Sequence, residues 1–549
     1  MQAEIAARLE EIIKYMGPYL PLANCHMVNF ITQQLWEKHV PELIQNEVGS
    51  ILGTDLNSIF FHYAKSSSND EVNDVRETIQ YYPHFNNFLE SARNMSMRGH
   101  AQEKLLTGHD EIKSKLVDLG WEVPEDFYME QFMTHKKMHE VEVMGNVVSA
   151  LEHVTEASHI VDVGGGKGYL SSFLSLYHGL RVLGVDSSQV NTHGAIKRTR
   201  KLERVWTGLC RRADMLKQGD APPRRGKHWK SHGPEENQKG MSEEKEILYR
   251  QVTEFQQFET DNCERLGIVG LHTCGDLASS CLRIFCERPE FTFLCNVGCC
   301  YHLMEEKHCR NPFWDDVDLS SAAKSYGFPM SQFLNNKEFF LGRNARMLAA
   351  QSLDRMGEQQ EAQTESLYFR ALLQVLLLER CGENVPWGQV GRLTAKCVNF
   401  VDYVQKALKR LKLDIQMTGY EFPDYPETST IDGFITVAIL NNCCIQRLDL
   451  MTWEATGNEV DLLLVLFQSN VDRDEIEALH RNHCHEQEKL HIFFLLRVSL
   501  APVIETIILL DRLLYLHEQG VQEAHLIRLF DPVISPRCYC ITAFSKNTH

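Results

Sequence analysis

The stretch Ile160-Val-Asp-Val-Gly-Gly-Gly-Lys-Gly-Tyr-Leu170 decides the fold of this chain. Residues 158–163 include several β-branched side chains and predict a short strand, and the glycines that follow predict a tight loop. The next residues, Tyr169–Tyr177, have apolar side chains at helical spacing. The sequence therefore predicts a strand, a loop and a helix, which is the kind of unit whose loop binds a ligand.

The spacing of the glycines indicates the kind of ligand. Gly164, Gly166 and Gly168 alternate, whereas the dinucleotide fingerprint Gly-x-Gly-x-x-Gly places its third glycine one residue later. Alternation favours S-adenosylmethionine over NAD, because bare backbone lets the methionine part of this cofactor lie against the loop while N–H groups at the helix start face its carboxylate. NAD-dependent oxidoreduction is the disfavoured alternative.

Carboxylates stand where a nucleotide-type cofactor needs them. Arg181–Val185 predicts a second strand that is followed by Asp186, 24 residues after Asp162, and Rossmann-like sheets place a carboxylate there to hold the ribose hydroxyls. We expect Asp162 and Asp186 to bind cofactor with the glycines. The alternative is a glycine-rich turn beside an ordinary surface aspartate. It would not explain why a strand, a loop, a helix, a second strand and a terminal aspartate follow one another in this order. Leu209–Asp214 predicts a third strand, which makes Asp214 a candidate acceptor for the adenine amino group.

Composition restricts the class of protein. The formal net charge of −18 argues against binding nucleic acid by bulk electrostatics, so there is no strong nucleic-acid signal, although a local basic groove is compatible with this average. The 17 cysteines include no Cys-x-x-Cys pair, as expected for reduced thiols in the cytoplasm or nucleus. The most apolar stretch, residues 491–510, is interrupted by Arg497, Pro502 and Glu505, so we expect no membrane span.

Periodicity divides the chain into four parts. Residues 1–130 predict a helical N-terminal region, residues 131–302 the first part of an α/β domain, residues 303–490 a mainly helical insertion, and residues 491–549 a closing helix with two strands. Residues 217–246 have almost no large apolar side chain and predict a disordered insert. The expected fold is α/β, a Rossmann-like sheet completed from two separated pieces of sequence.

Reactive side chains follow two predicted strands, Leu266–Leu271 and Phe291–Val297. Because ligands bind outside the carboxyl ends of parallel strands, we expect these side chains to meet at the site. A histidine could act as general base, an aspartate could orient it or a substrate amine, and a cysteine could be a nucleophile. Each residue alone is also explained by ordinary packing. The candidate catalytic residues are His272, Asp276, Cys300 and His302, and His272 is also a candidate for cofactor binding.

A metal is the competing explanation for this group of cysteines and histidines. The spacing of Cys274, Cys299 and Cys300, with His272 and His302, is not that of a zinc module. Methyl transfer to a nucleophile also needs no metal. We therefore expect no metal ion here, nor in the histidine-rich residues 480–491.

Several stretches together resemble one family. They are Lys136–Glu140, Asp162–Leu170, Leu271–Leu277, Cys299–His302, Leu341–Arg346, Ala501–Leu513 and Leu529–Arg537. In these residues the sequence is similar to the methyltransferase-like protein 25 family, and the resemblance covers most of the chain from about residue 130 onward. It implies a seven-stranded class I methyltransferase fold and S-adenosylmethionine as cofactor, and it leaves the methyl acceptor open among RNA, protein and small molecules.

A fainter likeness concerns the acceptor. His272-x-Cys-Gly275 and Cys299-Cys-x-His302 resemble motifs of the eukaryotic tRNA 2′-O-methyltransferases. The family has also been compared with rRNA adenine dimethylases, which carry Asn-Leu/Ile-Pro-aromatic after the fourth strand. This chain has Leu271-His-Thr-Cys274 at that place, which argues against methylation of adenine N6. We expect an S-adenosylmethionine-dependent methyltransferase with RNA or protein as the favoured acceptor. The alternative is a non-catalytic binding or scaffold protein that keeps the fold.

Overall fold

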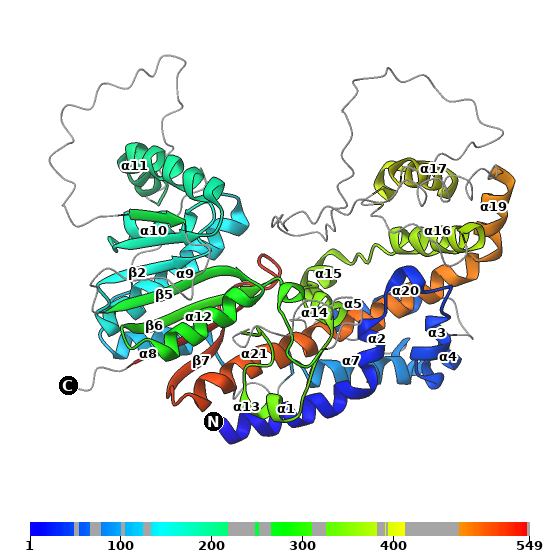
Figure 1. Ribbon diagram of the computed structural model, residues 1–549, viewed down its shortest axis with the longest axis horizontal. Coiled ribbons are helices and arrows are strands. Elements are labelled where there is room, and N and C mark those ends of the chain that lie inside the picture. Colours follow the sequence, from blue (N-terminus) through cyan, green and yellow to red (C-terminus); the bar gives the residue numbers. More distant parts are fainter. Residues whose placement is uncertain are drawn as a thin grey trace, which may run out of the picture.

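The chain folds into a sheet covered by helices and a second, helical half (Figure 1). The computed structural model describes residues 1–48, 54–65, 78–99, 105–123, 133–217, 247–251, 265–309, 325–381, 390, 393–411 and 472–545. The disordered insert predicted for residues 217–246 lies outside the described residues, except for Lys217, which ends a helix.

One mixed sheet forms the α/β half. Its strands are β1 (Leu106–Thr107), β2 (His159–Val163), β3 (Val182–Asp186), β4 (Ile247–Gln251), β5 (Leu266–Cys274), β6 (Phe291–Cys299), β7 (Glu523–Arg528) and β8 (Tyr539–Phe544). They lie in the order β1-β7-β8-β6-β5-β2-β3-β4. Only β8 is antiparallel to its neighbours, β6 and β7. The predicted seven-stranded methyltransferase sheet is confirmed, with the two-residue β1 as an additional edge strand.

Helices cover both faces of this sheet. They are α9 (His135–Thr155), α10 (Tyr169–Leu176), α11 (Gln189–Lys217), α12 (Asp276–Glu287) and α21 (Ala501–Glu518). The chain steps outward from β2 to β3 in one direction and from β5 to β6 in the other. Because such crossovers are right-handed, α10 and α12 lie on opposite faces. The carboxyl ends of β2 and β5 therefore form the switch point at which ligands bind in this architecture.

The prediction of a third strand at residues 209–214 is wrong. These residues lie inside α11, whose 29 residues run from Gln189 to Lys217, and the strand beside β3 is β4. Leu202 and Leu209, two helical turns apart, are both buried, so helical periodicity continues through the segment. Asp214 is therefore not at a strand end. The prediction that it accepts a hydrogen bond from the adenine amino group depended on that position and has no further support.

The helical half is assembled from three separate stretches of sequence. The N-terminal region contributes α1 (Gln2–Met16), η1 (Gly17–Tyr19), α2 (Leu20–Asn24), η2 (Met27–Asn29), α3 (Leu35–His39), α4 (Glu42–Val48), α5 (Thr54–Ala64) and α7 (Pro83–Asn94). The next helix, α8 (His109–Asp118), lies beside the sheet instead, against α9 and β7 (Figure 1). Later residues contribute η5 (Tyr301–Leu303), α13 (Gln332–Asn336), α14 (Arg343–Leu348), α15 (Leu353–Gln359), α16 (Glu365–Cys381), η6 (Thr394–Lys396), α17 (Phe400–Arg410), α19 (Arg473–Asn482) and α20 (Cys484–Ser499).

Helices α20 and α21 connect the two halves. Together they form one apolar stretch, Cys484–Glu518, that is long enough to cross a membrane by length and composition, yet 89% of its most apolar window is buried inside the protein. The stretch runs from the helical half to the sheet in Figure 1. Hydrogen bonds from Tyr63 Oη to the Ser499 carbonyl (3.1 Å) and from the Met97 N–H to Thr506 Oγ1 (2.9 Å) join the N-terminal region to it. It is the central core helix of the molecule.

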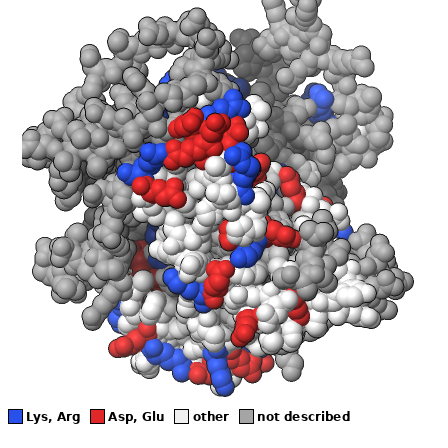
Figure 2. Space-filling model, turned by 90° about the vertical axis from the view of Figure 1, so that its right-hand side faces the viewer, with Lys and Arg blue, Asp and Glu red and all other residues white. Residues whose placement is uncertain are grey.

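The end of the helical half that carries α19 has mixed charge. Figure 2 shows Lys and Arg interspersed with Asp and Glu on the described part of this face. Two ion pairs there are Arg380 with Glu475 and Arg473 with Glu477. Opposite charges that alternate in this way do not form the continuous basic surface that binds a nucleic-acid backbone.

Candidate functional site

The glycine loop between β2 and α10 has a backbone that only glycine adopts readily. Gly164, Gly166 and Gly168 have φ values of +69°, +56° and +70°, in the left-handed region that disfavours a side chain. The Gly164 N–H donates to the Val185 carbonyl at 2.8 Å, and the Gly168 N–H donates to that of Gly165 at 2.8 Å. The alternating glycines are therefore needed for the backbone conformation of the loop.

Asp186, the last residue of β3, faces the loop. Its carboxylate accepts hydrogen bonds from the Gly166 N–H (3.0 Å), the Ser188 N–H (2.8 Å) and Asn191 Nδ2 (3.2 Å). A carboxylate offers about four acceptor positions. Three protein donors therefore leave about one position of Asp186 for a ligand hydroxyl. The predicted neighbours, the glycines and Asp186, are in contact.

Asp162 lies beneath the loop. Its side chain is buried, and Ser171 Oγ donates to its Oδ2 at 2.5 Å. Burial raises the pKa of Asp162 to about 6, and the hydrogen bond from Ser171 acts in the opposite direction. This carboxyl therefore ties β2 to the first turn of α10, so it acts on the shape of the loop.

The loop fits a ligand that lies against bare backbone. Within the described part of the chain, a Cβ built on Gly166 would have no neighbour closer than the Gly164 carbonyl oxygen at 3.7 Å, which leaves space there. Arg198 of α11 donates from Nη1 to the Lys167 carbonyl at 2.9 Å and lies over the Tyr169 ring. The loop is thus held from two sides while the space beside Gly166 stays clear, which fits the methionine part of S-adenosylmethionine.

His272 lies in a bulge of β5, not after the strand as predicted. The register between β5 and β6 shifts between Leu271 and Thr273, and His272 has φ +69°. A bulge redirects a side chain. Here it places His272 Nε2 at 3.1 Å from Oε1 of Glu140, which belongs to α9.

Glu140 is the centre of a buried polar cluster. Its side chain is 0% exposed, and its carboxylate meets Lys137 Nζ at 2.8 Å, Ser535 Oγ at 2.6 Å and Lys136 Nζ at 3.6 Å. Burial acts to raise the pKa of Glu140, but the hydrogen bonds and charges of His272 and Lys137 outweigh it and hold this pKa below its ordinary value. Glu140 is therefore ionised and fixes the orientation of the His272 imidazole.

Asp276 is the first residue of α12 and directly follows Gly275. Its Oδ1 accepts the Glu305 N–H at 3.0 Å, which ties the loop after β6 to α12. Burial raises the pKa of Asp276 to about 6, and the Glu305 hydrogen bond opposes this. Asp276 thus holds the loop after β6 in place. Its role in orienting a base or a substrate amine stays a prediction.

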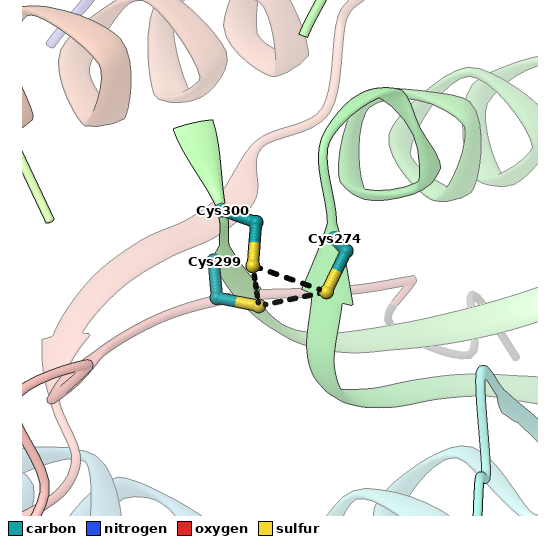
Figure 3. A group of neighbouring side chains, drawn as sticks. All are labelled: Cys274, Cys299 and Cys300. Carbon is teal, nitrogen blue, oxygen red and sulfur yellow. Dashed lines mark hydrogen bonds between the residues drawn. The ribbon is translucent and has the colours of Figure 1, made fainter. Parts of the chain in front are cut away.

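Three thiols meet where β5 and β6 end (Figure 3). Cys274 Sγ lies 3.2 Å from Cys299 Sγ and 3.4 Å from Cys300 Sγ, and the last two are 3.6 Å apart. Hydrogen bonds from the other two thiols, with the nearby His302 and His272, lower the pKa of Cys300, although burial opposes them. His302 is buried, and its Nδ1 has no hydrogen-bond partner among the described residues.

The loop that carries Tyr301 and His302 is held by the helical half. Arg346 of α14 donates from Nη1 to the Tyr301 carbonyl at 2.9 Å, and its Nε lies 3.2 Å from Glu306. Tyr301 Oη donates to Glu505 at 2.9 Å, and Arg537 pairs with the same oxygen at 2.9 Å. Residues far apart in sequence therefore fix one edge of the candidate site.

The structure brings most of the predicted residues to one edge of the sheet. Gly164, Gly166, Gly168 and Asp186 lie around the loop, His272 lies in the bulge near the end of β5, and Asp276, Cys300 and His302 follow β5 and β6. The sequence did not place Glu140, Arg198 or Ser535 in the site. Only Glu140 gave a signal, since it stands in the charged group Lys136–Glu140 of a helix that leads into β2.

Comparisons with known proteins agree with this architecture. A family described as a methyltransferase domain matches residues 136–307. The mouse protein named "Probable methyltransferase-like protein 25" is 29% identical over 638 aligned residues, covering 98% of this chain and 96% of the mouse protein. The human protein of the same name is 27% identical over 649 residues, covering 99% and 97%. The similarity thus extends over both halves of the fold.

Proposed function

Because this chain belongs to the methyltransferase-like protein 25 family, we propose that it transfers a methyl group from S-adenosylmethionine to a nucleophilic oxygen, nitrogen or sulfur atom of an RNA or protein. The methyltransferase domain at residues 136–307 contains the glycine loop, Asp186 and both reactive strand ends.

The observation that supports cofactor binding is the hydrogen bond from the Gly166 N–H to the Asp186 carboxylate at 3.0 Å. This hydrogen bond places the backbone of the glycine loop beside the carboxylate at the end of the neighbouring strand, β3. The glycines would hold the amino-acid end of the cofactor, and Asp186 would accept a ribose hydroxyl at its remaining acceptor position. When bound, S-adenosylmethionine supplies an activated methyl group on a positively charged sulfur.

His272 is the residue that we expect to remove the proton of the acceptor. Glu140 holds Nε2 of the imidazole at 3.1 Å, so the ring carries its proton on Nε2 and Nδ1 is the basic nitrogen. The His272 side chain is 26% exposed, which leaves it accessible to an acceptor. General base catalysis of this kind contributes about 10²–10⁴-fold to a rate. The remaining residues align the reactants.

Isothermal titration with S-adenosylmethionine tests cofactor binding. Asp186→Ala should weaken binding by about tenfold or more, since it removes a hydrogen bond to a charged group, whereas Asn191→Ala should leave binding intact because it only frees an acceptor position. No binding to the wild-type chain at millimolar ligand, or equal binding by Asp186→Ala, contradicts the proposal.

Transfer is tested separately with labelled cofactor and a cell extract divided into RNA, protein and small-molecule fractions. Label should enter the RNA or the protein fraction and disappear with His272→Ala. Cofactor binding without transfer into any fraction would favour the non-catalytic alternative.

A further inference from the structure

The three thiols at the ends of β5 and β6 form a ligand set that the sequence spacing did not reveal. Their Sγ atoms are 3.2, 3.4 and 3.6 Å apart, and all three point toward one another (Figure 3). In tetrahedral zinc sites the zinc–sulfur distance is about 2.3 Å, which places neighbouring sulfurs about 3.8 Å apart. An expansion of a few tenths of an ångström would therefore admit an ion.

We propose that Cys274, Cys299 and Cys300 bind one zinc ion through their sulfur atoms and leave its fourth coordination position open to an exogenous ligand. Each thiol that binds loses its proton to solvent, because the thiolate is the ligand. The zinc proposal does not depend on cofactor binding at the glycine loop, so either one can fail alone.

Two backbone features bring the sulfurs together. The parallel register places Cys274 opposite Cys299. Neighbouring residues of a strand normally point to opposite faces, but Cys300 has φ +50° and ψ +48°, and this turn lets Cys299 and Cys300 share one side. A left-handed conformation is unfavourable for a residue other than glycine and persists where the surroundings demand it.

A zinc ion explains this arrangement better than a disulfide does. A disulfide would need only Cys274 and Cys299, whereas Cys300 lies within 3.6 Å of both. Among the described residues, three ligand atoms make up the group. Zinc sites with three protein ligands keep a position for water or substrate, and Cys274 and Cys300 are partly exposed. The open position would therefore be reachable from solvent.

Metal analysis of the full chain, purified under reducing conditions with zinc present, tests the site. The wild-type chain should hold about one zinc ion, and Cys274→Ser and Cys300→Ser should lose it. Cys286→Ser is the matched control, since Cys286 is a partly buried thiol of neighbouring α12 and should keep the metal. If the serine variants fail to fold, alkylation of wild-type thiols gives the answer: Cys274, Cys299 and Cys300 should become reactive only after a chelator is added.

The open position is tested with cobalt in place of zinc. The sulfur-to-cobalt absorption bands of the wild-type chain should shift when 2-mercaptoethanol is added. An unchanged spectrum would contradict an open position. A chain without zinc, a zinc content that Cys274→Ser and Cys300→Ser leave intact, a disulfide detected by mass, or iron with inorganic sulfide would overturn the zinc site.

Discussion

Nε2 of His272, in the bulge of β5, lies 3.1 Å from the carboxylate of Glu140, near the start of α9. The contact joins a strand and a helix that are far apart in the sequence of the matched domain. It gives the predicted base a fixed orientation and a buried negative partner.

Glu140→Gln should slow methyl transfer by about tenfold or more while cofactor affinity stays the same, because an amide does not stabilise the positive charge that His272 gains when it takes a proton. The measurement is label transfer into the acceptor fraction, with cofactor titration in parallel. Glu152→Gln, in the last turns of the same helix, is the matched control. An unchanged transfer rate in Glu140→Gln would remove Glu140 from the mechanism.

Gly166→Ala should abolish cofactor binding and leave the chain folded. The new Cβ would occupy the open face of the loop at a residue with φ +56°, and the strain costs about 1–2 kcal/mol. Gly208→Ala is the control: Gly208 lies in α11 with no neighbour within 4 Å of an added Cβ, so it should stabilise the helix by about 0.5–1 kcal/mol. Titration calorimetry and thermal unfolding measure both effects. Normal cofactor affinity in Gly166→Ala would show that the ligand does not lie on this loop.

Asp162 should make the folded state less stable as the pH rises. Burial raises its pKa from 3.8 to about 6 in the folded chain, so the folded state binds the proton more tightly than the unfolded state. The resulting stability is fully present below about pH 4 and is lost as the pH rises through about 6. The difference amounts to roughly 3 kcal/mol.

The measurement for Asp162 is urea unfolding at a series of pH values, in the wild-type chain and in Asp162→Asn. The wild-type free energy of unfolding, relative to the variant, should fall between about pH 4 and pH 6. Ser171→Ala, which removes the hydrogen bond at 2.5 Å, should move the decline to higher pH. Parallel curves for wild type and Asp162→Asn would refute the assignment.

Glu505→Ala should destabilise the chain by about 3–5 kcal/mol, because it leaves the guanidinium of Arg537 buried without its ionic partner. Both side chains are only 10% exposed. Glu477→Ala breaks the exposed pair with Arg473 and should change stability by about 0.5 kcal/mol or less. Equal effects of the two substitutions in chemical unfolding would mean that the buried pair does not hold the halves together.

The sequence predicts the parts of this fold whose signals are local. The strand, loop and helix at residues 158–177, the strand before Asp186 and the helix α12 each carry their own periodicity or glycines, and all are present. The third strand was misplaced because Leu209 and Cys210 are apolar neighbours, whereas buried Leu202 and Leu209 continue a helix. Propensity over six residues cannot separate these two possibilities.

The site was predicted only in part, for a different reason. Parallel strands end at one edge, so the placement of His272, Asp276, Cys300 and His302 at that edge follows from topology. The bulge at His272 and the left-handed turn at Cys300 occur at residues other than glycine, so the sequence contains no signal for them. Both conformations depend on tertiary contacts, which a single sequence does not display.

The position of β8 between β6 and β7 also affects how the protein can be made. It follows every other strand in sequence, so the nascent sheet keeps an unfilled slot between two strands until this segment leaves the ribosome. Until then the edge of β6 offers unpaired backbone groups to any passing strand. Biosynthesis of this protein therefore has a vulnerable interval during which chaperones would protect the chain from aggregation.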